Sequence, residues 1–279
     1  MTQSADQNPD SRRLVMGAAV GYGPREVRIF VESLRACGYR GDIVMFVGAG
    51  SRDLKAYLKS RGATPISVFH IRRIHGPIHS RRIPLFCDFL NKHADKYDEV
   101  LTSDVRDVAF QDHPFEGLSG GGCQFYLEAA PHTIGSDRHN SGFARTFLSP
   151  EEADALGPRR ITCCGVVLGG TAAIRSYLNR IRALMAAIPA RKRYKIGADT
   201  AFHGLLAYLQ PAPDSVVVEN NVRVATMGLE PHELYRLEPG PRVVYAPSGA
   251  APPILHQYDR YDDIAAAFEQ RFEASVKQA

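Results

Sequence analysis

The sequence contains no tryptophan, and no stretch of it approaches the roughly 20 apolar residues that a membrane-spanning helix needs. Its polar start, residues 1–13, lacks the apolar core of a signal peptide. The five cysteines are an odd number without CxxC spacing, which argues against a disulfide scaffold and against a zinc knuckle. We therefore expect a soluble, cytoplasmic protein with at most peripheral membrane contact.

A strong charge of one sign is also missing. The 34 basic and 30 acidic residues give a net charge of +4, which is too small for a dedicated nucleic-acid binder. A local basic groove for phosphates is compatible with this balance. With 279 residues and 44% apolar content, the chain is long enough to bury a substantial core in one continuous domain.

Apolar runs alternate with helical patterns in the first half of the chain. We expect strands at 14–20, 42–47, 65–69 and from Val100, separated by helices at 25–37, 52–61 and 83–93. This alternation predicts an α/β protein with a mostly parallel central sheet and helices on both faces. The second half is less regular, and residues 1–13 are expected to form a disordered tail.

Two carboxylates follow the apolar run that begins at Val100. Asp104 and Asp107 stand where a strand ends, and ligands of parallel sheets bind beyond the carboxyl ends of the strands. Carboxylate oxygens suit Mg²⁺ or Mn²⁺, which neutralise a diphosphate. The alternative is a turn in which Asp107 caps backbone amides and Arg106 pairs with Asp104.

Other side chains suit the same chemistry. His256 follows a strand-like stretch and offers a nitrogen ligand to the same cation, or is a surface histidine. Tyr22 lies between two glycines after the first expected strand, where it is placed to stack on a base, or belongs to a plain strand-to-helix turn. That segment is not GxGxxG, so it gives little support to a dinucleotide site.

A basic cluster precedes the helix expected at 83–93. Arg81 and Arg82 in it are candidates to grip phosphates, and a solvated charged face is the competing account. Asp199 and Glu128 are candidates to orient an acceptor hydroxyl, although Asp199 is also a fitting N-cap. The full cluster is Arg72, Arg73, His75, His79, Arg81 and Arg82.

Cys163 and Cys164 are interpreted as buried packing, since cysteine behaves as a small hydrophobe. No histidine or basic partner adjoins them in the sequence.

The order of these segments resembles the GT-A superfamily of nucleotide-sugar-dependent glycosyltransferases, from Leu14 to Arg260. VMGAAVGYGPREVRIFVESLR resembles its first strand and helix, and VLTSDVRDVAFQDHPF resembles its D-x-D strand end. ITCCGVVLGG, GADTAFHGLL and ILHQYDR resemble its later segments, the last of these containing the histidine that completes a metal site. The DVRDVxFQxxPF and HQYDR wording is most similar to a group of uncharacterised bacterial and plant glycosyltransferase-like proteins.

This resemblance implies a single GT-A-like domain over 14–279, with a nucleotide-binding half at 14–115 and an acceptor half at 116–279. It implies a nucleoside-diphosphate sugar as donor, with a UDP-sugar expected, and a glycan or other hydroxyl compound as acceptor. Asp104 would contact the ribose or the metal, and Asp107 and His256 would hold Mn²⁺ or Mg²⁺. Tyr22 would lie near the base, and Arg81 or Arg82 at the phosphates.

The sequence departs from the superfamily pattern in two respects. Two residues rather than one separate the aspartates, so strand alternation would place Arg106 beside Asp104, where it could neutralise the diphosphate and make the metal dispensable. Cys163, Thr200 and Gly204 replace the usual Asn, Gln and Asn. The competing functions are a sugar-nucleotide pyrophosphorylase and a non-catalytic nucleotide-sugar or carbohydrate-binding protein.

Overall fold

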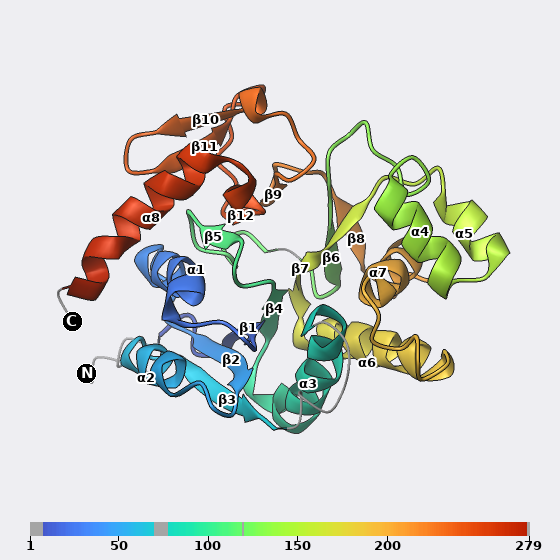
Figure 1. Cartoon of the computed structure of the whole chain (residues 1–279), viewed down its shortest axis with the longest axis horizontal. Coiled ribbons are helices and arrows are strands. Elements are labelled where there is room, and N and C mark those ends of the chain that lie inside the picture. Colours follow the sequence, from blue (N-terminus) through green and yellow to red (C-terminus); the bar gives the residue numbers. More distant parts are fainter. Residues whose placement is uncertain (1–7, 70–77, 119, 278–279) are drawn as a thin grey trace, which may run out of the picture.

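A seven-stranded sheet forms the centre of the computed structural model, which describes residues 8–69, 78–118 and 120–277 (Figure 1). Its strands are β1 (Arg13–Ala19), β2 (Asp42–Gly48), β3 (Thr64–Val68), β4 (Glu99–Ser103), β6 (Cys123–Leu127), β7 (Thr162–Gly170) and β8 (Val216–Val218). They lie in the order β3-β2-β1-β4-β7-β6-β8, and only β7 runs against its neighbours. The prediction of a mostly parallel sheet is confirmed.

Helices cover both faces of this sheet. They are α1 (Pro24–Ala36), α2 (Arg52–Ser60), α3 (Ile78–His93), α4 (Arg138–Phe147), α5 (Pro150–Leu156), α6 (Thr171–Ala187), α7 (Ala198–Tyr208) and α8 (Asp262–Lys277). Successive strand residues point to opposite faces. On β1, Leu14 and Met16 pack with α3, α6 and α7, whereas Val15 between them packs with α1 and α2.

A second, small sheet brings distant parts of the chain together. It consists of β5 (Val108–Phe110), β12 (Ile254–His256) and β9 (Val224–Thr226), with β12 in the middle. The antiparallel register of β12 and β5 pairs His256 with Val108. The end of β12 therefore lies beside the turn that joins β4 to β5. A hairpin of β10 (Tyr235–Glu238) and β11 (Arg242–Tyr245) lies near α8 (Figure 1).

The start of α3 differs from the prediction. The helix begins at Ile78 rather than near Ile83, and Pro84 lies inside it. Proline is most frequent in the first turn of a helix, so a start close to Pro84 is the ordinary interpretation. The longer helix matters because Ser80 and Arg82 lie on its first turns, where Ser80 bonds to Asp199 and Arg82 pairs with Asp104, the residue that follows β4.

Two expectations fall partly outside the described residues. Residues 1–7, Arg72, Arg73 and His75 are not among them, nor is the side chain of His79. The rest of the expected disordered tail, residues 8–13, differs from that expectation because Asp10 is buried and pairs with Arg13 at 2.8 Å and with His113 at 3.0 Å.

No helix within the described ranges is both long enough and apolar enough to cross a membrane.

Candidate functional site

The turn between β4 and β5 is held in place from two sides. The amide of Asp104 donates to the carbonyl of Gly165 on β7 at 2.6 Å, and the amide of Gln257 donates to the carbonyl of Asp107 at 2.7 Å. Gln257 adopts a left-handed conformation with φ of 60° directly after β12. These contacts fix both aspartates next to His256.

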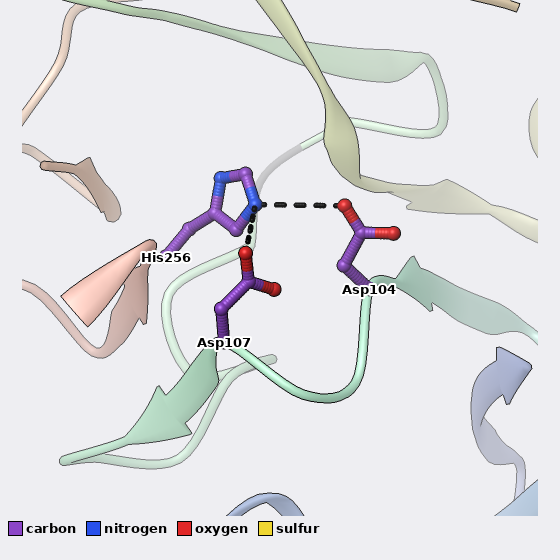
Figure 2. Close-up of side chains that lie close together, drawn as sticks. All are labelled: Asp104, Asp107 and His256. Carbon is purple, nitrogen blue, oxygen red and sulfur yellow. Dashed lines mark ion pairs between the residues drawn. The ribbon is translucent and has the colours of Figure 1, made fainter. Parts of the chain in front are cut away.

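Asp104, Asp107 and His256 converge on one point (Figure 2). The Nε2 atom of His256 lies 3.5 Å from Oδ2 of Asp104 and 4.0 Å from Oδ2 of Asp107. All three ligand atoms lie within 4.8 Å of one another. The Nε2 atom is buried and has no hydrogen-bond partner among the described residues. An orphaned buried nitrogen is costly, and a bound cation would satisfy it.

These residues fit a hard divalent cation. Ligand atoms about 2.1 Å from Mg²⁺ lie about 3 Å apart when adjacent and about 4 Å apart when opposite. The distances of 3.5 and 4.0 Å from Nε2 of His256 to the two carboxylates fall in this range. Two carboxylate oxygens and one imidazole nitrogen also suit Mn²⁺. The pKa of Asp107 is raised, mainly by burial. His256 opposes this rise, and the neighbouring Asp104 carboxylate adds to it. A cation would relieve this crowding of negative charge.

Arg106 does not share a face with Asp104 in the way that the strand pattern predicted. Because β4 ends at Ser103, residues 104–107 form a turn instead of continuing the strand. The guanidinium of Arg106 lies 3.1 Å from a carboxylate oxygen of Asp259. Both aspartates therefore face His256, and Arg106 lines the neighbouring cavity without standing between them.

Cys163 orients the histidine ring from the other side. Its Sγ lies 3.0 Å from Nδ1 of His256 and accepts the amide of Gly165 at 3.3 Å. With the sulfur at Nδ1, the opposite nitrogen points at the two carboxylates. The interpretation of Cys163 as mere packing missed this contact, because the two residues are 93 positions apart in the sequence.

Gly165 leaves the space in which the site closes. A Cβ atom at this position would lie 2.6 Å from Oδ2 of Asp104 and 2.7 Å from Nε2 of His256. Real Cβ atoms do not approach other atoms so closely. A glycine in the middle of β7 weakens a strand, and close approach of other groups is a common reason for it.

Arg82 is buried against the same aspartate. Its guanidinium pairs with Asp104, donates to the carbonyl of Cys164 at 3.1 Å and lies 3.9 Å from Asp199. Asp199 is only 3% exposed and accepts the hydroxyl of Ser80 at 3.1 Å. Asp199 lines neither of the two cavities described below, and it contacts the site through Arg82.

The first cavity, of about 440 Å³, opens on one side of Asp104. Tyr22, Arg82 and Arg106 all line it, together with both aspartates, Ala18, Ile78, Val105, Gln257 and Arg260. Arg81 is absent from this wall. It is 5% exposed, and its guanidinium lies 5.3 Å from the centre of the Tyr194 ring. Of the two arginines predicted to meet phosphates, Arg82 alone lines the cavity.

The second cavity, of about 300 Å³, shares Asp104, Gln257 and Arg260 with the first, and His256 lines the second alone. Glu128, which follows β6, lines it. Burial raises the pKa of Glu128 to about 7, with a lowering from His256 and a further rise from Asp137. A carboxyl group with this pKa exchanges its proton near neutral pH.

Arg260 belongs to the polar segment that follows His256, but no role was predicted for it from the sequence. It lies on the short 3-10 helix η4 (Tyr258–Arg260) and lines both cavities. The signal that would have found it is a cation in the same short polar segment as the histidine.

Comparisons with known proteins do not extend this picture: no protein-family model matches the chain, and no curated protein matches it.

Proposed function

We propose that the protein is a glycosyltransferase that transfers a sugar from a nucleoside-diphosphate sugar, with UDP-sugars as the expected donors. The observation that carries this proposal is the convergence of Asp104, Asp107 and the orphaned Nε2 of His256 between two cavities. This point lies beyond the end of a parallel strand, where α/β proteins bind ligands.

The first cavity suits the donor. Its guanidinium groups, from Arg82, Arg106 and Arg260, match the charge of a diphosphate. Tyr22 offers an aromatic ring to a base. The volume of about 440 Å³ falls in the range of small-molecule sites.

Asp104, Asp107 and His256 would hold Mn²⁺ or Mg²⁺, which supplies positive charge to the departing diphosphate. Arg82 is already fixed by Asp104, Asp199 and the carbonyl of Cys164, so little reorganisation is needed to present its charge. We assign Asp199 to this positioning task, in place of the acceptor-orienting role expected from the sequence.

The second cavity suits the acceptor. An acceptor hydroxyl bound there lies in a space walled by Asp104, His256 and Glu128. In its ionised form, Glu128 accepts the proton that this hydroxyl loses when its oxygen bonds to the sugar. In this proposal, donor and acceptor would lie on two sides of one metal-ligand cluster.

Titration calorimetry with a panel of nucleoside-diphosphate sugars, with and without Mn²⁺, tests the proposal. We expect binding that depends on Mn²⁺ and is lost in the double variant Asp104→Ala, His256→Ala. Asp112→Asn is the matched control, because Asp112 pairs with Arg242 at 2.9 Å in a half-exposed contact and lines neither cavity. No nucleotide binding, or unchanged binding in the double variant, would refute the site.

The released nucleotide distinguishes the competing functions. Transfer or hydrolysis releases a nucleoside diphosphate, whereas a pyrophosphorylase forms a nucleoside triphosphate when pyrophosphate is added. A protein that binds the donor but turns over neither way would be a binding protein.

A further inference from the structure

A groove of about 490 Å³ borders the second cavity. Its walls come from α4 and from the residues just before α7, and α4 packs on α7 (Figure 1). His139 and Phe143 line both the second cavity and this groove. We call it the α4 groove, and its lining residues are Arg138, His139, Gly142, Phe143, Thr146, Phe147, Lys195 and Ile196.

The α4 groove has an exposed apolar floor. Ile196 is 60% exposed, an unusual value for a large aliphatic side chain, and Phe143 lies beside it in the groove. Gly197 has a φ of 86°, and a Cβ atom there would collide with the ring of Phe143, so the turn sits directly against α4.

The rim of the groove is positive. Arg138 and Lys195 both line it, and neither forms an ion pair with another described residue. None of the described residues that line the groove is acidic. The second cavity differs in this respect, because Glu128, Asp137 and Asp104 line it. Moving outward from the metal ligands, the surface changes from acidic to basic and apolar.

We propose that the α4 groove binds an anionic phospholipid and so holds the protein at a membrane surface. Arg138 and Lys195 match the charge of the headgroup phosphate, and Ile196 with Phe143 matches its acyl chain. Because His139 and Phe143 line both the groove and the second cavity, the acceptor would then be a hydroxyl of a lipid-linked molecule. That last step rests on the proposed glycosyltransferase function, whereas lipid binding itself does not.

Co-sedimentation with vesicles tests the inference on the full chain. We expect binding to vesicles of phosphatidylcholine mixed with phosphatidylglycerol, weakened by salt, and little binding to phosphatidylcholine alone. Each cation near an anionic surface contributes about fivefold in affinity, so Arg138→Ala with Lys195→Ala should weaken binding about 25-fold. Ile196→Ser should weaken it further, and circular dichroism confirms that each variant folds.

The matched control removes two exposed cations elsewhere, Arg52→Ala and Lys59→Ala on α2, at the opposite side of the molecule (Figure 1). Equal binding to both vesicle types would overturn the inference. So would a loss of vesicle binding in the control variant as large as that in the variant of Arg138 and Lys195. Complete competition by soluble glycerol phosphate would show that a free phosphate ester is the ligand, which also overturns it.

Calorimetry with the donor separates this inference from the proposed function. A protein that binds anionic vesicles but no nucleotide sugar contradicts the proposed function alone. A protein that binds the donor but no vesicles contradicts the lipid inference alone.

Discussion

The Sγ atom of Cys163 lies 3.0 Å from Nδ1 of His256, on the side of the ring opposite the two aspartates. A histidine that binds a metal through one nitrogen is usually held at the other by a hydrogen-bond acceptor. The sulfur also accepts the amide of Gly165. Cys163 thus connects the backbone of β7 to the proposed metal site.

Loss of this contact should weaken metal binding while leaving the fold intact. We expect Cys163→Val to lower Mn²⁺ affinity by about 10- to 100-fold, the usual cost of removing such a partner. Calorimetry with Mn²⁺ measures the effect. Cys37→Ser is the control, because its Sγ donates to the carbonyl of Leu34 on α1 and Cys37 lines neither cavity. Equal affinity of Cys163→Val and the wild-type protein would refute the role of the sulfur.

Gly165→Ala tests whether the site needs the space beside β7. The added Cβ would press on Asp104 and His256, so we expect loss of Mn²⁺ binding and a decrease of about 1–3 kcal/mol in the free energy of unfolding. Urea unfolding and calorimetry give the two values. Gly142→Ala on α4 is the control, because a Cβ there meets no atom within 4 Å. It should lower neither the Mn²⁺ affinity nor the free energy of unfolding.

The pH dependence of transfer should follow Glu128. As its pKa is about 7, the carboxylate that accepts a proton forms above that pH, and the rate should rise through about pH 7. Glu128→Gln should abolish this rise and reduce the rate by about 10²- to 10⁴-fold. A rate that rises through pH 7 equally in the variant would remove Glu128 from the chemistry.

The same carboxyl group should affect stability in the opposite direction. Its pKa is higher in the folded state than the ordinary value of 4.5, so the folded state binds more protons and stability falls as pH rises from about 4.5 to 7. Above pH 7, Glu128→Gln should therefore be more stable than the wild-type protein, by up to about 3 kcal/mol. Thermal unfolding of both proteins at pH 5, below the pKa, and at pH 8, above it, measures the difference in stability between them. If Glu128→Gln were less stable than the wild-type protein at pH 8, this account would be contradicted.

Asp199 should act through Arg82. We expect Asp199→Asn to raise the dissociation constant for the nucleotide sugar and to lower the free energy of unfolding by about 1–3 kcal/mol, because Arg82 loses a buried countercharge. Asp88→Asn is the control, since Asp88 forms an exposed pair with Arg182, which is worth less than about 1 kcal/mol. Unchanged donor binding in Asp199→Asn would leave Asp199 a purely structural residue.

Much of the sheet could be predicted from the sequence, because strands such as β2 and β4 are short apolar runs between helical patterns. The candidate metal ligands were also found, since Asp104 and Asp107 follow a strand. The contact of His256 with Cys163 and the ion pairs of Arg82 were not. They depend on how β5 pairs with β12 and how α3 meets β7, and such long-range packing leaves no local pattern in the sequence.

Arg106 shows the limit of the strand pattern. Period-two alternation places it beside Asp104 only if the strand continues past Ser103. The chain turns instead, because Asp104 bonds to Gly165 and Asp107 bonds to Gln257. The position of two aspartates in one turn was therefore a better guide to the site than their spacing.

The central claim is that Asp104, Asp107 and His256 hold one divalent cation next to the donor cavity. Anomalous diffraction at the manganese edge, from crystals grown with Mn²⁺ and UDP, tests it most directly. The account predicts one strong peak about 2.0–2.3 Å from Nε2 of His256 and from an oxygen of each aspartate. A peak elsewhere, or no peak between these three residues with UDP bound, would contradict it.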